Sequence, residues 1–149
     1  MNTTLCYDLK RAEHASRTAA DERLAPLGLN APQFGAMVML DETPGLSSAE
    51  LARRCFVTPQ TINGMVQGLE RRGLLVRGAH PTHGRILETF LTAEGRAVLE
   101  QAREVMLALD VQMTADLTAA EEEQLRELLY RCIDAVERRD KASGVVASV

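Results

Sequence analysis

Aromatic side chains are scarce in this sequence of 149 residues, which has no tryptophan, two tyrosines and three phenylalanines. Such a chain has little material for an aromatic-lined catalytic pocket. It also lacks a Ser/His/Asp arrangement, a phosphate-binding loop, a metal-ligand cluster and a catalytic pair of carboxylates. These absences predict that the protein is not an enzyme, and they give no reason to expect a cofactor.

Cysteine and long apolar runs are scarce as well. Cys6, Cys55 and Cys132 are odd in number and far apart, and no CxxC pair occurs, which argues against a disulfide framework and a zinc ribbon. The uncharged runs are too short to span a bilayer, and the N-terminus has no apolar signal segment. We therefore expect a cytoplasmic protein with no membrane partner, folded as one domain with helical extensions.

Positive charge is in deficit overall but concentrated in the middle of the chain. The net charge is −4, yet residues 46–96 hold seven arginines against four glutamates. Residues 1–45 and 97–149 are both net acidic. A basic segment between acidic flanks is typical of a DNA-binding module carried on a separate scaffold.

The most informative stretch of the chain is residues 58–73. Thr58 can cap a helix with its hydroxyl, Pro59 suits the first helical position, and Gly73 can end the helix. Apolar residues recur at i, i+3, i+4 and i+7, which predicts one buried face; they are Ile62, Met65, Val66 and Leu69.

The opposite face of this helix carries short, uncharged donors and acceptors of the kind that can read base edges in a major groove. Gln60, Gly64 and Gly68 lie on one line at i, i+4 and i+8. Each glycine costs roughly 1 kcal/mol relative to alanine in a helix interior. Bare backbone there would allow close approach either to a DNA groove or to a neighbouring helix, and the sequence leaves both alternatives open.

A short helix precedes this one. A capping box from Ser47 to Glu50 predicts a helix over Ser48–Cys55, and three residues then lead to Thr58. Two helices joined by so tight a turn have the layout of a helix-turn-helix. An earlier helix is expected to begin after Asn30, with its buried face formed by Phe34, Met37, Val38 and Leu40.

Two short strands are expected after the helix-turn-helix, over residues 74–77 and 86–91, separated by a turn-rich loop that ends in Arg85. Together these elements predict a winged helix. Arg85 would enter a minor groove, although a solvated loop arginine is the ordinary alternative. His80 and His83 form an H-x-x-H pair without further ligands nearby in sequence, so we expect no metal site and favour contact with phosphate.

The remaining helices provide more apolar surface than a small winged helix needs. They are expected over residues 5–27, after Thr92 and after Thr118. We therefore divide the chain into a winged helix-turn-helix at 30–96 and a helical dimerisation region at 1–29 and 97–149. A two-fold dimer would pair two recognition helices. The predicted fold class is mainly α, with a small β-hairpin wing.

In order and spacing, these segments resemble the MarR/SlyA family of bacterial transcription regulators. The similar segments are LAPLGLNAPQF (24–34), SAELA (48–52), VTPQT (57–61), LERRGLL (69–75) and LTAEG (91–95). The resemblance implies a homodimer on a pseudo-palindromic DNA operator, usually a repressor, released by a small molecule. Gly84 departs from the family pattern, which usually has an aspartate immediately before the wing arginine.

The resemblance also implies candidate switches. The family commonly binds aromatic or phenolic acids, and His14, Arg17, Met37 and Met39 are candidate lining residues. Residues 5–9 resemble the reactive-cysteine stretch of the peroxide-sensing OhrR branch, which makes Cys6 a candidate redox site. Lys10 and Ala20 stand where that branch has tyrosines, and Lys10 one turn away would favour the Cys6 thiolate.

The predicted DNA contacts fall into three groups. Groove-facing residues of the recognition helix are Thr58, Pro59, Gln60, Thr61, Asn63, Gly64 and Gln67; phosphate contacts are Arg53, Arg54, Arg71 and His83; the minor-groove residue is Arg85. The rival interpretation is a winged-helix interaction module without DNA binding, which would have a neutral outer helix face and no wing arginine.

Overall fold

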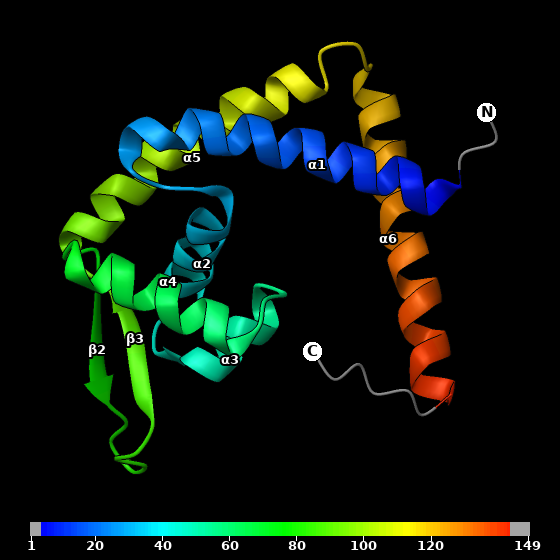
Figure 1. Ribbon diagram of the computed structural model, residues 1–149. Coiled ribbons are helices and arrows are strands. Elements are labelled where there is room, and N and C mark those ends of the chain that lie inside the picture. The colour runs from blue at the N-terminus through cyan, green and yellow to red at the C-terminus, as the bar shows by residue number, and fades with distance from the viewer. Residues whose placement is uncertain (1–3, 144–149) are drawn as a thin grey trace. The chain divides into compact units, whose positions relative to one another are not determined.

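The computed structural model describes residues 4–143 of the chain. Figure 1 shows a helical chain with one small antiparallel sheet, which confirms the predicted fold class. In order, the elements are α1 (Leu5–Leu24), η1 (Ala25–Leu27), α2 (Ala31–Glu42), β1 (Leu46–Ser47), α3 (Ser48–Arg54), α4 (Pro59–Arg71), β2 (Leu75–Ala79), β3 (Leu87–Leu91), α5 (Ala93–Met113) and α6 (Ala119–Ser143).

The chain divides into two compact units, Met1–Leu109 and Asp110–Val149. The first unit holds the whole predicted winged helix together with α1 and most of α5. The second unit holds the last turn of α5 and all of α6. The boundary between the units therefore lies inside α5.

Helix starts follow the predicted caps. The Thr58 hydroxyl accepts a hydrogen bond from the Thr61 amide at 3.2 Å. Complete capping boxes form at Asn30 with Gln33 and at Ser47 with Glu50. The backbone N–H and the hydroxyl of Ser47 lower the pKa of the Glu50 carboxyl by donating to it. This stabilisation is present above the ordinary glutamate pKa and is lost as the pH falls through the lowered value.

The first helix is shorter than predicted. It ends at Leu24, and residues 25–27 form a tighter 3-10 turn. Pro26 accounts for the difference, because its ring and its missing N–H are incompatible with continued α-helix. Gly28 then reverses the chain with φ +67°.

The sheet has the order β1-β3-β2, with antiparallel pairs throughout. The sequence did not predict β1, whose two residues pair with Thr89 and Glu88 of β3. Strand β2 runs to Ala79 rather than stopping at Arg77, since Gly78 and Ala79 pair with β3. Both differences come from long-range pairing, which overrides local propensity.

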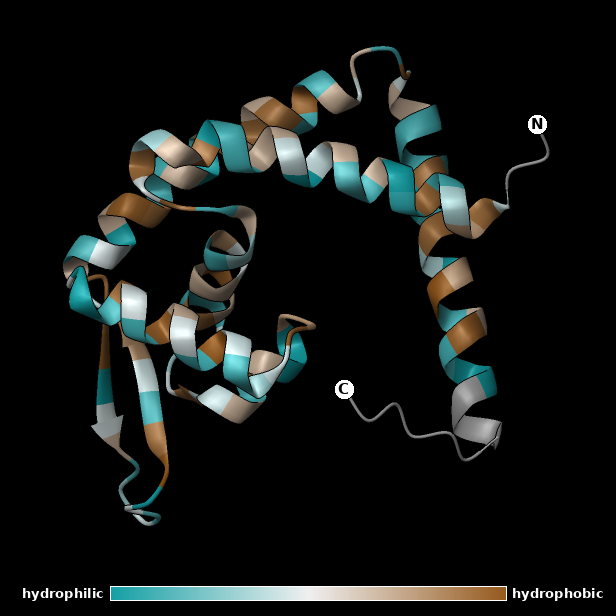
Figure 2. Cartoon of the chain, viewed as in Figure 1, coloured by the Kyte–Doolittle hydropathy of each residue, from teal (hydrophilic) through white to brown (hydrophobic). Residues whose placement is uncertain are grey.

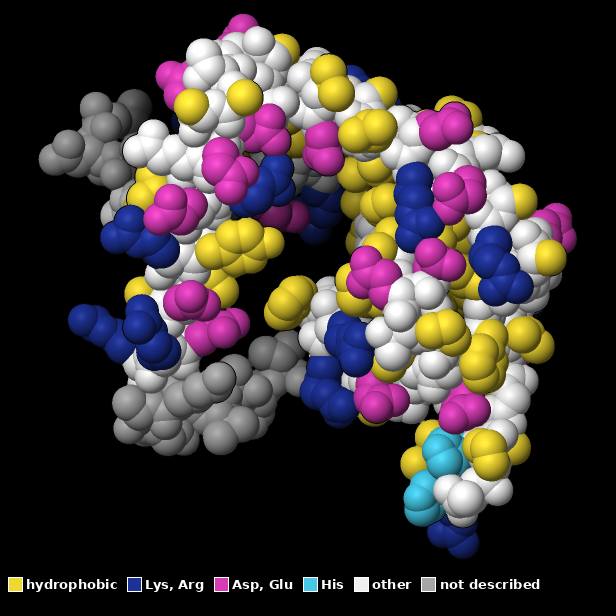
Figure 3. Space-filling model, turned by 180° about the vertical axis from the view of Figure 1, so that it is seen from behind, with side chains coloured by type: hydrophobic (Ala, Val, Ile, Leu, Met, Phe, Trp, Pro, Cys, Tyr) yellow, Lys and Arg dark blue, Asp and Glu magenta, His cyan; other side chains and the backbone are white. Residues whose placement is uncertain are grey.

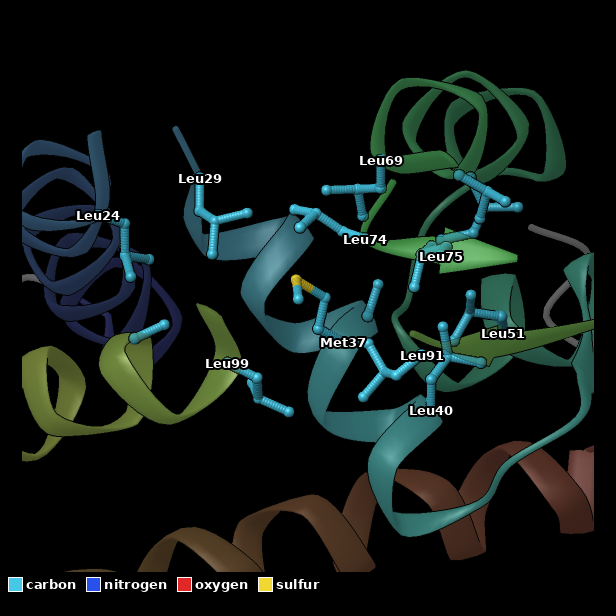
Figure 4. Close-up of a cluster of buried hydrophobic side chains, with 14 of the residues drawn as sticks. Leu24, Leu29, Met37, Leu40, Leu51, Leu69, Leu74, Leu75, Leu91 and Leu99 are labelled. Carbon is cyan, nitrogen blue, oxygen red and sulfur yellow. The ribbon is translucent and has the colours of Figure 1, made fainter. Parts of the chain in front are cut away.

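The core joins the recognition region to α2 and α5 (Figure 4). Leu40, Leu51, Leu69 and Leu99 are fully buried in it. Met37 is also completely buried in this core, which confirms its place on the predicted buried face of α2. Its role as an effector-lining residue stays a prediction.

For the helix after Thr92, the spacing of apolar residues predicts a buried stripe of Val98, Ala102, Val105, Leu109 and Met113. Ala102 and Leu109 are buried and Met113 is exposed, whereas Leu99, which lies outside this stripe, is fully buried.

A tight junction attaches the recognition helix and the wing to α5. The Leu74 carbonyl accepts from the Thr92 amide at 3.1 Å, and the Gly73 carbonyl accepts from the Thr92 hydroxyl at 2.7 Å. Gly73 has φ +74°, a conformation that glycine adopts without penalty. Gly95 packs so closely that a Cβ there would stand 2.0 Å from the Leu74 oxygen.

Gly95→Ala should lower the free energy of unfolding by about 1–3 kcal/mol, because the added methyl must push the Leu74 backbone away. Urea unfolding followed by circular dichroism measures this change. Gly35→Ala in α2 is the matched control, since among the described residues no atom outside its own helix backbone and chain neighbours lies within 4 Å of a Cβ at that position. Equal stability of the two variants would contradict the tight junction.

Candidate nucleic-acid interface

The two faces of α4 are sharply different. Ile62, Val66 and Leu69 are fully buried against the core. All the predicted groove-facing residues are exposed together on the other side; they are Thr58, Pro59, Gln60, Thr61, Asn63, Gly64 and Gln67. The buried face therefore fixes the direction in which the polar face points.

The two glycines of α4 are not explained by packing within the chain. A Cβ at Gly64 or at Gly68 would meet no neighbouring atom within 4 Å among the described residues. The neighbouring-helix alternative therefore fails for residues 4–143. Close approach of this backbone to something outside the chain is the alternative that survives.

The arginines of the basic segment separate into two sets. Arg77 forms an ion pair of 2.6 Å with Glu70, and Arg72 donates to the carbonyls of Leu27, at 3.0 Å, and Gly28. These two guanidinium groups hold the fold together. The sequence did not indicate the Arg72 contacts, because Leu27 and Gly28 are far away along the chain.

Arg53, Arg71 and Arg85 are exposed, and within residues 4–143 they make no hydrogen bond or ion pair. Arg54 is exposed as well, but it donates to the Thr43 hydroxyl at 2.9 Å. Three cationic side chains around α4 and on the wing thus remain available for an anionic partner. An exposed, unpaired guanidinium can contact a phosphate or enter a minor groove.

The wing is a hairpin whose tip carries the loop between β2 and β3. Figure 3 shows histidine and a Lys/Arg side chain gathered at this tip. His83 and Arg85 are both exposed there. His80 lies inside the loop and faces Glu88 of β3, with its Nε2 3.7 Å from the carboxylate.

Phe56 is a residue that the sequence analysis left without a role. It lies in the turn between α3 and α4, has φ +55° and is 90% exposed. The Val57 amide donates to the Ala52 carbonyl at 3.1 Å, so Phe56 occupies the left-handed position after a helix that glycine usually fills. A phenylalanine directly after a helix, where glycine is expected, was the signal that could have found it.

The candidate switch residues are dispersed. His14 and Arg17 are exposed on α1, where Arg17 lies 3.4 Å from Glu13. Met39 is half-buried on α2. Cys6 is exposed in the first turn of α1, whereas Cys55 is half-buried and its burial raises the pKa of the thiol.

Within residues 4–143, no group of three or more histidine, cysteine or acidic side chains is arranged to hold a metal ion. None of the helices over residues 4–143 combines the length and the apolar character needed to cross a membrane.

A short helix, a tight turn, an exposed polar second helix and an arginine-bearing hairpin define a winged helix-turn-helix of the DNA-binding kind. A family model described as MarR family matches residues 27–86. The chain belongs to the MarR family of DNA-binding transcription regulators, which are not enzymes.

Relatives along most of the chain support this assignment. The transcriptional repressor Rv2887 of Mycobacterium tuberculosis is 42% identical over 127 residues, covering 85% of this chain and 91% of the repressor. Its structure with salicylic acid is 40% identical, covers 88% of this chain and 97% of that one, and has a TM-score of 0.73. Its structure with DNA is 37% identical, covers 88% and 98%, and has the same TM-score.

A second solved relative is the transcriptional repressor CouR, bound to a 23-mer DNA duplex. It is 29% identical, covers 87% of this chain and 92% of that chain, and has a TM-score of 0.82. The likeness therefore includes the winged helix and the helices on either side of it.

Gly64→Ala should separate stability from DNA binding. The substitution should raise the free energy of unfolding by about 0.5–1 kcal/mol, because alanine is the better helix former. It should weaken DNA binding, because the added methyl group would lie between the helix and the groove. The expected cost is about 1–3 kcal/mol, the same as for overpacking in a protein core. Urea unfolding measures the first effect. Fluorescence anisotropy measures the effect on DNA binding. The probe is a duplex that the wild-type protein selects from a random pool, called the selected duplex below.

Gly35→Ala is the control for this experiment, because Gly35 is also in a helix and, among residues 4–143, also has no neighbour within 4 Å of a Cβ. The Gly35→Ala variant should be more stable than the wild-type protein and should bind the selected duplex with wild-type affinity. Wild-type affinity in both variants would show that Gly64 is not required for close approach to DNA.

Proposed function

We propose that this protein is a homodimeric transcriptional repressor that binds a pseudo-palindromic operator and is released by a small aromatic or phenolic acid. The observation that carries the proposal is the exposed polar face of α4, flanked by Arg53 and Arg71 and followed by Arg85 on the wing. Rv2887 and CouR, two repressors solved with DNA, support the same function.

The proposal gives each exposed side chain a task. Gln60, Asn63 and Gln67 carry amides that can pair with base edges, and the Thr61 hydroxyl adds a further donor and acceptor. Arg53, Arg54, Arg71 and His83 contact phosphates, which fix register without specifying sequence. Arg85 enters the minor groove beyond the recognition helix, where narrow A·T-rich segments attract arginine.

The homodimer is supported by the apolar face of α6. Figure 2 shows hydrophobic residues recurring along this helix. Leu125, Leu128, Leu129, Ile133 and Val136 are all exposed in the single chain. An apolar stripe of this length is rarely left in water, and a second copy of the chain is the partner that also pairs two recognition helices on a palindrome.

The effector is proposed from the salicylic acid complex of Rv2887. A carboxylate of this kind needs a cationic or hydrogen-bonding partner, and His14 and Arg17 on α1 are exposed and able to supply one. Met39 on α2 is half-buried and would contribute apolar contact with the ring.

Thiol oxidation is a second candidate switch because Cys6 is exposed on α1. Peroxide would then release the protein from the selected duplex, and Cys6→Ser would abolish that response without changing binding in its absence. Release by peroxide in the Cys6→Ser variant would rule this switch out.

Gln60→Ala and Arg71→Ala should weaken binding in different ways. The first removes a base-edge contact, so it should cost about 1–3 kcal/mol on the selected duplex and relax the preference for one base pair. The second removes a phosphate contact, so it should weaken binding to all duplexes alike and lower the salt slope by about one. Anisotropy titrations at several salt concentrations measure both effects.

The matched comparison is the selected duplex against a scrambled duplex of the same composition. An equal loss for Gln60→Ala on both duplexes would contradict its assignment to a base edge. If the wild-type protein selects no duplex at all, the proposed function itself is wrong.

Salicylate should dissociate the wild-type protein from the selected duplex, whereas salicylamide should act far more weakly, because it keeps the ring and loses the charge that Arg17 would bind. Arg17→Ala should respond to salicylate only at higher concentration while binding DNA normally. The test is the same anisotropy assay with increasing ligand. Equal action of the charged and uncharged compounds would contradict recognition of a carboxylate.

A further inference from the structure

The loop at the wing tip, residues 80–86, is closed by an unusual set of hydrogen bonds. The His80 amide donates to the Ile86 carbonyl at 2.9 Å, and the Ile86 amide donates to the His83 carbonyl at 2.8 Å. The second bond closes a four-residue turn, 83–86, with Gly84 and Arg85 as its central residues. Arg85 therefore projects from a turn whose first residue is His83.

The side chain of His80 holds this turn in place. Its Nδ1 atom accepts from the backbone N–H groups of Thr82 at 3.1 Å and of His83 at 3.2 Å. The Thr82 hydroxyl lies 3.2 Å from the same nitrogen. Two backbone donors thus converge on one lone pair, in the arrangement that an aspartate or asparagine oxygen provides in side-chain turns.

These contacts also fix the proton of the imidazole ring. A backbone N–H can only donate, so Nδ1 must be unprotonated and the proton of the neutral ring must lie on Nε2. Nε2 faces the Glu88 carboxylate at 3.7 Å. Pro81 helps as well, because it restricts His80 to extended backbone and has no N–H of its own to satisfy.

Arg85 itself has no internal support: no described residue makes a hydrogen bond or an ion pair with it. The residue before it, Gly84, has no side chain that could orient the guanidinium. Any preorganisation of Arg85 must therefore come from the backbone turn that carries it, and that turn is anchored at His83 by the His80 ring.

We propose that His80 is a positioning residue for DNA binding, which caps the wing-tip turn through Nδ1 and so presents Arg85 to the minor groove. The inference rests on the proposed function for its consequence, but the cap itself is a property of the free protein.

Nuclear magnetic resonance of the ¹⁵N-labelled protein tests the cap without DNA. At neutral pH the His80 ring should give an unprotonated Nδ1 and a protonated Nε2. The Thr82 and His83 amides should be slow to exchange with solvent compared with the Gly84 amide. A proton on Nδ1 of His80 would overturn the proposal, because that nitrogen could not then accept.

Binding to the selected duplex tests the consequence. His80→Ala should lower the affinity for the selected duplex about 3- to 10-fold and leave the midpoint of thermal unfolding unchanged. A loss of this size is within the range of coupling energies measured between neighbouring residues. His80→Asn should restore most of the loss, because its Oδ1 can accept the same two N–H groups. Circular dichroism confirms that the variants remain folded.

A double-mutant cycle shows whether His80 acts through Arg85. If it does, His80→Ala should change little when Arg85 is already alanine. Additive losses, or no rescue by asparagine, would overturn the positioning role while leaving DNA binding intact. Failure of the wild-type protein to select any duplex would instead overturn the proposed function, so the two failures are distinguishable.

Discussion

The contact between Leu74 and Gly95 is the constraint on which the DNA-binding unit depends. A Cβ at residue 95 would lie 2.0 Å from the Leu74 oxygen, so only glycine allows α5 to begin where it does. The Thr92 amide donates to the Leu74 carbonyl, and the Thr92 hydroxyl donates to the carbonyl of the preceding residue, Gly73. The end of the recognition helix, the start of the wing and the start of α5 are thereby fixed to one another. An interface made from two separate elements needs a rigid joint of this kind.

The recognition helix, α4, contributes to both the core and the surface. Three fully buried residues of α4 anchor it, and its outer face keeps two glycines that no contact within the described chain requires. The arginines also divide into a set that serves the fold and a set that remains on the surface. Arg72 and Arg77 stabilise the fold, and Arg53, Arg71 and Arg85 remain free of hydrogen bonds and ion pairs among the described residues. A net negative chain can in this way present a locally positive surface.

The sequence predicted local features well, because caps and amphipathic stripes depend on residues a few positions apart. Thr58, Ser47 and Asn30 cap the helices as expected, and the buried face of α4 was correctly assigned. Strand β1 and the partners of Arg72 depend on residues far along the chain, so no local pattern indicated them. The wing histidines show the same limit. The H-x-x-H spacing predicted phosphate contact for the pair, whereas in the structure the His80 ring accepts hydrogen bonds from the loop backbone.

Dimethyl sulfate footprinting on the selected duplex tests the central claim most directly, because the reagent methylates guanine N7 in the major groove and adenine N3 in the minor groove. If α4 and the wing dock together as a dimer, N7 protection should occur in two blocks separated by a whole number of helical turns, about 10 bp each. N3 protection should lie on the outer side of each block. Protection confined to one groove, or to a single block, would contradict the account.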